Sequence, residues 1–228
     1  MVVGQFSQDV DILVIGGGPA GYTAAFRTAE LGKTVAIVDP NPTLGGECLH
    51  HACIPSKGNL LGVDTTNAIE ALSKGLEQRC KSLGIDRLYG IAHFENKKSV
   101  QVTGEVVSVV KFKKAIIATG SMPRTHEDFP NAMQVEEVYA AIFENKKILV
   151  VGNTPSAVEA TTFLSSNNSV SLWTDGDILP TFDQQLVKLV KRSLSLCKEK
   201  PIAGQYDVVV LAGHRLPQTD SLQLENAN

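Results

Sequence analysis

Short apolar runs that end at glycine-containing turns mark two similar stretches of the chain. Asp11–Ile15 and Thr34–Val38 have the composition of buried parallel strands, and Tyr22–Leu31 between them has a helical pattern. A second stretch begins in the same way at Ile148–Val151 and reaches another strand-like run at Val170–Trp173. Strands that alternate with helices in this way predict an α/β fold.

The remaining residues predict one more helix, a group of strands and a final helix and strand. Ala68–Leu83 carries one apolar stripe of an amphipathic helix. The expected strands are Arg87–Phe94, Ser99–Val102, Glu105–Phe112 and Ala115–Ser121, the last ending in a glycine turn. A helix over Gln184–Leu196, and a strand and turn over Tyr206–Pro217, are expected near the C-terminus.

The first turn carries the G-x-G-x-x-G pattern of a dinucleotide-binding unit, and an acidic residue ends the next strand. Such a turn brings the backbone and a helix N-terminus to a pyrophosphate, while the acid accepts from a ribose hydroxyl. The alternative is a glycine turn that only joins a strand to a helix. The candidate cofactor-binding residues here are Gly16, Gly18, Pro19, Ala20, Gly21 and Asp39.

Two cysteines, Cys48 and Cys53, follow this unit closely. In a regular helix residues five apart rise by about 7.5 Å, whereas a disulfide needs Cα atoms roughly 4.4–6.8 Å apart. A disulfide between them therefore requires a distorted turn, which Gly45, Gly46 and Pro55 would permit or impose. The pair is read as redox-active. The alternatives are inert buried thiols, a structural disulfide, and a zinc site that adds His50 and His51.

The segment GGECLHHACIPSK, residues 45–57, resembles the redox-active segment of the flavin-dependent pyridine nucleotide–disulfide oxidoreductases. Its ending IPSK is most similar to that of dihydrolipoamide dehydrogenases and mercuric reductases. Glu47 stands where the family usually has Thr, and His50-His51-Ala52 replaces Asn-Val-Gly. The resemblance implies a Rossmann-like FAD-binding domain over residues 1–126 and a truncated NAD-type domain over residues 127–228.

The resemblance also implies the chemistry. Electrons would pass between NAD(H), FAD and the cysteine pair, with Cys53 nearest the flavin and Cys48 exchanging with a dithiol such as dihydrolipoamide. Lys57 would meet Glu159 beside the flavin ring, so that Cys48, Cys53, Lys57 and Glu159 are the candidate catalytic residues.

Further motifs similar to those of the family extend the predicted cofactor site. Ala118-Thr119-Gly120-Ser121 is similar to the second flavin-domain motif, and Gly90–Phe94 resembles the stretch whose backbone contacts the adenine. Taken alone, each could be an ordinary strand end. The cofactor-binding candidates added by resemblance are Gly45, Gly46, Glu47, Cys48, Lys57, Ala92, His93, Ala118, Thr119, Gly120 and Ser121.

The second glycine turn departs from its pattern. Gly152 is in place, but Thr154 and Ala157 occupy the second and third glycine positions. Thr174 stands where a ribose-binding acid is expected, and Asp175 follows it. The absence of a nearby arginine favours NAD over NADP. Gly152 and Thr154 are the candidate residues, and a remnant that binds no nucleotide is the alternative.

Composition narrows the class of partner. The net charge of −3 favours neither nucleic acid nor an acidic membrane. No apolar run approaches the ~20 residues of a membrane span, and the N-terminus lacks a signal-peptide pattern. Four cysteines without an export signal indicate a cytoplasmic protein, in which Cys80 and Cys197 are buried or incidental.

The resemblance covers only about half of a typical relative. The late part of the flavin domain and the C-terminal dimerisation domain, which supplies an acid/base pair, have no counterpart, so we expect weak turnover and leave the oligomeric state open. A non-catalytic flavin- or nucleotide-binding remnant and a Cys/His metal-binding module are the two other classes of function that the sequence permits.

Overall fold

The apolar runs of the sequence form two parallel-stranded sheets in the computed structural model, which describes residues 6–104 and 108–227. The described residues divide into two compact units. Unit 1 comprises the described residues within 1–54, 65–121 and 217–228, and unit 2 comprises residues 55–64 and 122–216. This division differs from the expected boundary after residue 126, because residues 55–64 group with unit 2 and residues 217–228 return to unit 1.

Unit 1 is built on a six-stranded sheet of order β3-β2-β1-β6-β5-β4. Its first four strands run parallel, while β6, β5 and β4 form an antiparallel meander. The strands are β1 (Phe6–Ile15), β2 (Val35–Asp39), β3 (Asp86–Tyr89), β4 (Ile91–Asn96), β5 (Ser99–Thr103) and β6 (Ser108–Ile117). The helices are α1 (Pro19–Glu30), α2 (Gly46–His50), α3 (Cys53–Leu61), whose residues from Pro55 belong to unit 2, and α4 (Thr66–Ser82).

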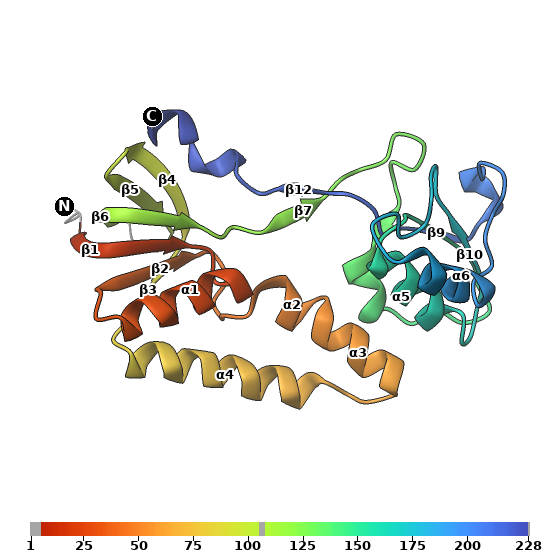
Figure 1. Cartoon of the computed structure of the whole chain (residues 1–228), viewed down its shortest axis with the longest axis horizontal. Helices are drawn as coiled ribbons and strands as arrows, with labels where there is room; N and C mark the ends of the chain where they lie inside the picture. The colour runs from red at the N-terminus through yellow and green to blue at the C-terminus, as the bar shows by residue number, and fades with distance from the viewer. Residues whose placement is uncertain (1–5, 105–107, 228) are drawn as a thin grey trace. The chain divides into compact units, whose positions relative to one another are not determined.

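The two faces of this sheet have separate cores. Figure 1 shows α1 and α4 on one face of the sheet and the C-terminal segment on the other. Phe26 of α1 and Cys80 of α4 pack with Val14 and Ile37 on one face. On the other face, the side chains of β4–β6 pack with Leu222, which is 1% exposed. Leu222 is the last residue of the 3₁₀ turn η3 (Asp220–Leu222), and a second such turn, η4 (Leu224–Ala227), follows it. The parallel strands are therefore covered on both sides, as their continuous apolar runs predict.

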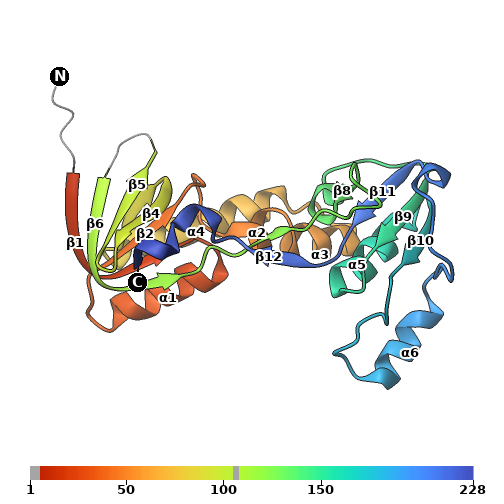
Figure 2. The same ribbon diagram turned by 90° about the horizontal axis from the view of Figure 1, so that it is seen from above.

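Unit 2 contains a four-stranded sheet of order β10-β9-β11-β8. The strands are β8 (Met133–Gln134), β9 (Lys147–Val151), β10 (Ser169–Trp173) and β11 (Val208–Leu211), and the helices are η1 (Val135–Tyr139), α5 (Pro155–Leu164), α6 (Gln184–Arg192) and η2 (Ala203–Gln205). Alternate residues of β9 face opposite cores: Ile148 packs with α5 and α6, whereas Leu149 packs with Phe129 and Trp173. Figure 2 shows α5 beside β9 and β10.

The two remaining strands form a separate two-stranded sheet. They are β7 (Ser121–Pro123) and β12 (Arg215–Pro217), which pair with each other. Both lie where the chain passes from one unit to the other.

Four expected elements are wrong in their extent. The single strand expected at Arg87–Phe94 is two strands on opposite edges of the sheet, because Gly90 has φ of +150° and turns the chain. The strands expected at Glu105–Phe112 and Ala115–Ser121 are largely one strand, β6, although residues 105–107 lie outside the described part. The last helix ends at Arg192, because residues 195–197 instead hydrogen-bond alongside Leu172 of β10.

Candidate functional site

The first glycine turn lies at the carboxyl edge of the unit 1 sheet. Gly16 N donates to Val38 O at 2.8 Å, and Ala118 N donates to Ile15 O at 2.7 Å. The turn therefore sits where β2 and β6 flank β1 on opposite sides, which is the switch point at which α/β sheets bind ligands. A Cβ built on Gly16 would lie 2.1 Å from Ala118 O, so the backbone approach here requires glycine.

The start of α1 is open at the second glycine of the pattern. A Cβ built on Gly18 would find Gly46 Cα, at 3.8 Å, as its nearest neighbour. A Cβ on Gly21 would lie 1.8 Å from Gly16 O, so the third glycine permits close helix–strand packing. Pro19 and Ala20 are exposed in the first turn of the helix. An open glycine at a helix N-terminus suits a pyrophosphate.

Asp39 is buried, 6% exposed, and its carboxylate reaches the glycine turn. Oδ2 accepts from Gly17 N, and Oδ1 accepts from Asn41 N at 2.7 Å and from Asn41 Nδ2 at 2.9 Å. The acid predicted from the sequence therefore lies directly beside the turn. This is the placement that the dinucleotide pattern requires, and these unit 1 residues fit a dinucleotide such as FAD.

Residues 45–57, which resemble the family's redox-active segment and are called the redox segment below, begin against the same turn. Gly45 N donates to Gly17 O at 3.0 Å, and Gly45 and Gly46 have φ of +128° and +56°. The predicted distortion is confirmed, because α2 ends at His50 and α3 begins at Cys53. Cys48 is half-buried within α2, and Cys53 is exposed.

Leu44 anchors the loop that leads into this segment. It is fully buried, its N–H donates to Glu77 Oε1 at 3.2 Å, and its carbonyl accepts from His50 Nε2 at 3.1 Å. Glu77 also pairs with Arg87 of β3. The histidine that departs from the family pattern thus holds the loop in place.

The alternative zinc site finds no support in the described residues. Across residues 6–104 and 108–227, no group of three or more His, Cys, Asp or Glu side chains has the arrangement of a metal site. His50 is directed to Leu44 O and Thr43 Oγ1, while Glu47 and His51 are exposed.

Lys57 and Glu159 are in contact, as expected. Lys57 Nζ lies 2.6 Å from Glu159 Oε1, and the buried Ser56 donates to Glu159 Oε2 at 2.6 Å. Burial raises the pKa of Glu159, but the hydrogen bonds from Lys57 and Ser56 and the Lys57 charge outweigh it, so the pKa is lowered. The carboxylate is therefore held in its charged form.

The stretch expected to contact the adenine, Gly90–Phe94, forms hydrogen bonds with the C-terminal residues Ser221 and Asn226. Ala92 is buried in β4, while His93 Nδ1 lies 2.7 Å from Ser221 O and its Nε2 lies 3.0 Å from Thr103 Oγ1. Asn226 Nδ2 donates to Phe94 O at 2.8 Å. The His93 side chain is thus engaged within unit 1, which leaves only its backbone as a cofactor contact.

The second flavin-type motif follows β6 at the same edge as the glycine turn. Ala118 and Thr119 are half-buried, and Gly120 is exposed with φ of +72°. Gly120 O accepts from Gln218 N at 3.0 Å, and Ser121 begins β7. The motif therefore lies at the carboxyl edge of the strand next to β1.

The second glycine turn, at Gly152, has the same backbone hydrogen bonds as the first, but a side chain lies at the start of its helix. Gly152 N donates to Trp173 O at 2.9 Å, and Ala212 N donates to Val151 O at 2.8 Å. Thr154 caps α5, accepting from Ala157 N at 3.3 Å and donating to Ala212 O at 2.6 Å. Thr154 thus places a side chain at the position where the first turn has Gly18, which has none.

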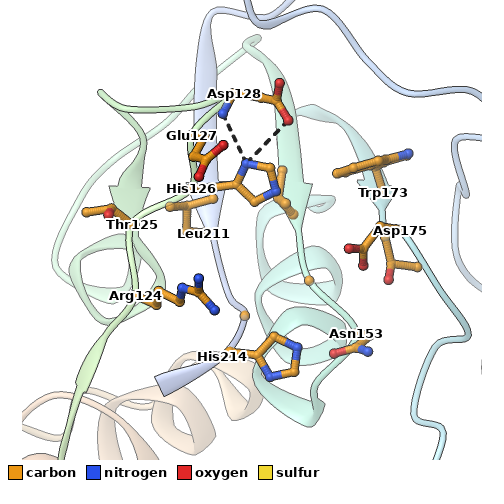
Figure 3. Close-up of a pocket in the computed structure, with 14 residues that line it drawn as sticks. Arg124, Thr125, His126, Glu127, Asp128, Asn153, Trp173, Asp175, Leu211 and His214 are labelled. Atoms are coloured by element: carbon orange, nitrogen blue, oxygen red, sulfur yellow. Dashed lines mark hydrogen bonds and ion pairs between the residues drawn. The ribbon is translucent and has the colours of Figure 1, made fainter. Parts of the chain in front are cut away.

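A cavity of about 320 Å³ lies at the carboxyl edge of the unit 2 sheet (Figure 3). His126 packs against Phe129 and Trp173, with ring centroids 5.1 and 6.2 Å away. The His126 ring also lies 3.6 Å from Asp128, whose pKa is lowered by a hydrogen bond from Lys200. Sequence reasoning missed the Arg124–Asp128 part of this lining, because that loop carries no motif. His214 lies in the stretch Tyr206–Pro217, where a strand and turn are expected, but the sequence assigns no role to it.

The other two cysteines are distinct from the redox segment. Cys80 is 1% exposed, and burial raises its pKa to about 11. Cys197 Sγ lies 3.4 Å from the Tyr206 hydroxyl. Cys80 is thus the buried core thiol that the sequence predicts, and Cys197 is half-buried.

Comparison with known proteins places these features in a family. The model of the pyridine nucleotide-disulphide oxidoreductase family matches residues 10–196, a range that contains both turns and the redox segment. The chain belongs to this family. Members of the pyridine nucleotide–disulfide oxidoreductases are FAD-dependent enzymes, and those of the dihydrolipoyl dehydrogenase type use FAD and NAD(H).

Curated relatives support the family assignment. Dihydrolipoyl dehydrogenase of Bacillus subtilis is 33% identical over an alignment that covers 85% of this chain and 48% of the relative. The Geobacillus stearothermophilus enzyme of the same name is 30% identical with the same coverage, and that of Buchnera aphidicola is 27% identical over 95% of this chain. The chain spans about half the length of the curated relatives it matches.

None of the helices that the structure describes has the length and apolar content that a membrane span requires.

Proposed function

We propose that the chain binds FAD in unit 1 and passes electrons between FAD and the Cys48/Cys53 pair, as a disulfide oxidoreductase of the dihydrolipoamide dehydrogenase type. The observation that carries the proposal is the hydrogen bond from Gly45 N to Gly17 O. It joins the start of the redox segment to the glycine turn, so a cofactor at that turn lies next to the cysteines.

The residues that would hold FAD are those at the carboxyl edge of the unit 1 sheet. The open N-terminus of α1 at Gly18 would take the pyrophosphate, and Asp39 would accept from a ribose hydroxyl. The backbones of Ala92 and His93, and the turn Ala118–Ser121, complete the set by resemblance. When bound, FAD would supply the acceptor that takes the two electrons on from the reduced cysteine pair.

The cysteines would carry out thiol–disulfide exchange with a dithiol substrate. One substrate thiolate attacks Cys48 Sγ of the oxidised pair, the Cys48–Cys53 bond breaks, and Cys53 leaves as a thiolate. The second substrate thiol then displaces Cys48 from the mixed disulfide. The substrate loses two electrons and two protons and closes its own disulfide, while the cysteine pair becomes a dithiol. Such chemistry suits a reducing compartment such as the cytoplasm.

Lys57 is proposed to support the thiolate of Cys53. The two residues are four positions apart on α3, and side chains at that spacing share one face of a helix. A nearby cation favours the thiolate form of a cysteine, which is the nucleophile in exchange. Glu159 and Ser56 fix this cation, because the carboxylate accepts from both Lys57 Nζ and Ser56 Oγ.

A second candidate is a flavin-binding protein without turnover. Thr154, which fills the second dinucleotide turn, favours this candidate, since a flavoprotein that cannot exchange electrons with NAD(H) has no cycle of its own. Both candidates require FAD in unit 1. They differ in whether a dithiol reduces the bound flavin through the cysteines.

An anaerobic titration of the FAD-loaded chain with dihydrolipoamide tests the proposal. Wild type should lose its flavin colour, and the count of reactive thiols should rise by two when the oxidised protein is reduced. Cys48→Ser and Cys53→Ser should abolish both changes, whereas Cys197→Ser should behave as wild type. Bleaching of the flavin in Cys48→Ser at the wild-type rate would remove the cysteine pair from the proposal.

A further inference from the structure

The two glycine turns of this chain are built on the same hydrogen-bond frame. Gly16 N bonds to Val38 O as Gly152 N bonds to Trp173 O. In the same way, Ala118 N bonds to Ile15 O as Ala212 N bonds to Val151 O. The frame makes the two turns comparable residue by residue.

Within this frame Thr154 corresponds to Gly18, and the two positions differ in one decisive respect. Gly18 caps α1 without a side chain, and the nearest atom to a Cβ built there is Gly46 Cα at 3.8 Å. Thr154 caps α5 with its hydroxyl, which donates to Ala212 O at 2.6 Å and accepts from Ala157 N at 3.3 Å. One turn is open and the other is bridged.

The bridge lies at the switch point of the unit 2 sheet. β10 and β11 flank β9 on opposite sides, so the crevice for a ligand is expected between the carboxyl ends of β9 and β11. Thr154 follows β9 and Ala212 follows β11. The hydrogen bond between them therefore crosses the place where a dinucleotide would bring its pyrophosphate to the helix.

A second difference concerns the first turn of α5. Ala157 stands at the position of Gly21, where a Cβ would lie 1.8 Å from Gly16 O. Because Ala157 has that methyl group, the second turn cannot repeat the contact between Gly21 and Gly16 O atom for atom.

The ribose-binding acid differs too, and it does so independently of the turn. Val38 pairs with Ile15 and is followed by Asp39, and Trp173 pairs with Val151 and is followed by Thr174, so the two residues occupy corresponding positions. Asp39 accepts from Gly17 N, whereas the Thr174 hydroxyl accepts from Gly176 N at 3.3 Å. The carboxylate that a ribose needs is absent from the corresponding position.

We propose that Thr154 is a specificity-determining residue that closes the dinucleotide crevice of unit 2, so that NAD(H) is not held there by its pyrophosphate. The inference rests on the proposed function, because it concerns the nucleotide with which a disulfide oxidoreductase of this family would exchange electrons. The cavity at the same edge remains, but it reaches Asn153 rather than Thr154, and three carboxylates, Glu127, Asp128 and Asp175, line it with Arg124 as a cation. That lining does not replace the phosphate site.

Equilibrium binding of NADH to the full chain tests the proposal. Gly18→Val is included in every sample so that unit 1 cannot take the nucleotide. Thr154→Gly should bind NADH at least about tenfold more tightly than Thr154, because it reopens the turn, and glycine is itself a good N-cap residue. Thr154→Ala should gain affinity as well, whereas Thr154→Ser keeps the hydroxyl bridge and should match the parent.

Failure of the Thr154 proposal and failure of the proposed function give different results. Equal NADH affinity in the parent and in Thr154→Gly, whether strong or weak, would overturn the role of Thr154. Circular dichroism verifies that each variant is folded, and Thr154→Ala replaces Thr154→Gly in the comparison if the latter is not. FAD retention and thiol counts are measured separately on protein with Gly18 intact. A colourless protein in that measurement would remove the proposed function and leave the result on Thr154 standing.

Discussion

Lys57 Nζ lies 2.6 Å from Glu159 Oε1, although the two residues are 102 positions apart in the chain. The contact joins α3 to α5 within unit 2 and is reinforced by Ser56, which is 2% exposed. An ion pair between partly exposed side chains contributes little by itself. Its effect is positional, because it fixes the Lys57 side chain of α3 against α5.

Acid should weaken this attachment. The pKa of Glu159 is lowered from 4.5, so the folded state favours the carboxylate, and the stabilisation is complete above pH 4.5 and is lost as the pH falls through the lowered value. We expect the melting temperature of the wild type to fall more steeply below pH 4.5 than the melting temperature of Glu159→Gln. Glu144→Gln changes an exposed glutamate and should follow wild type. Parallel curves for wild type and Glu159→Gln would contradict the assignment.

Gly18→Val should abolish FAD binding without unfolding the chain. Gly18 has φ of −75° and ψ of −176°, an extended conformation that valine accepts, and the added side chain would fill the open space at the helix N-terminus. We expect FAD affinity to fall at least about tenfold, or about 1.4 kcal/mol, in a fluorescence titration.

Gly75→Ala is the matched control for that variant. Gly75 is exposed within α4, and a Cβ there would enter open space. Alanine should raise the free energy of unfolding by about 0.5–1 kcal/mol and leave FAD affinity unchanged. Equal FAD affinity in Gly18→Val and Gly75→Ala would show that the pyrophosphate does not approach α1.

Cys80 should be inert in the native protein. Burial raises its pKa to about 11, so at pH 8 only about a thousandth of it is thiolate, the reactive form. Iodoacetamide at pH 8 should leave Cys80 unlabelled until the chain is denatured, as peptide mass spectrometry would show. Native labelling of Cys80 at the rate of Cys53 would mean that the core around α4 opens readily.

The sequence predicts the parts of unit 1 in which local and global preferences agree. The glycine turn at Gly16, the acid at Asp39 and the break between Cys48 and Cys53 each follow from a local requirement of backbone geometry, and the structure contains all three. Long-range pairing is a different matter. Nothing in the local sequence shows that Gly90 sends β3 and β4 to opposite edges of one sheet.

The same distinction explains what was missed in unit 2. The identity of Thr154 shows that the second turn is altered, but only the fold brings its hydroxyl to Ala212, 58 residues away. His126 and Trp173 likewise meet through the packing of a loop against β10, and no spacing between them signals a cavity. Side chains that come together from separate loops follow no periodic pattern, so the sequence does not predict the site that they form.

The absorption spectrum of the purified chain, recorded after addition of excess FAD and gel filtration, tests the central claim most directly. If unit 1 binds FAD at Gly16–Gly21, Asp39 and Ala118–Ser121, the protein should elute yellow with stoichiometric flavin, and Gly18→Val should elute colourless. A wild-type protein that elutes folded and colourless would contradict the proposal that this chain is a flavoprotein.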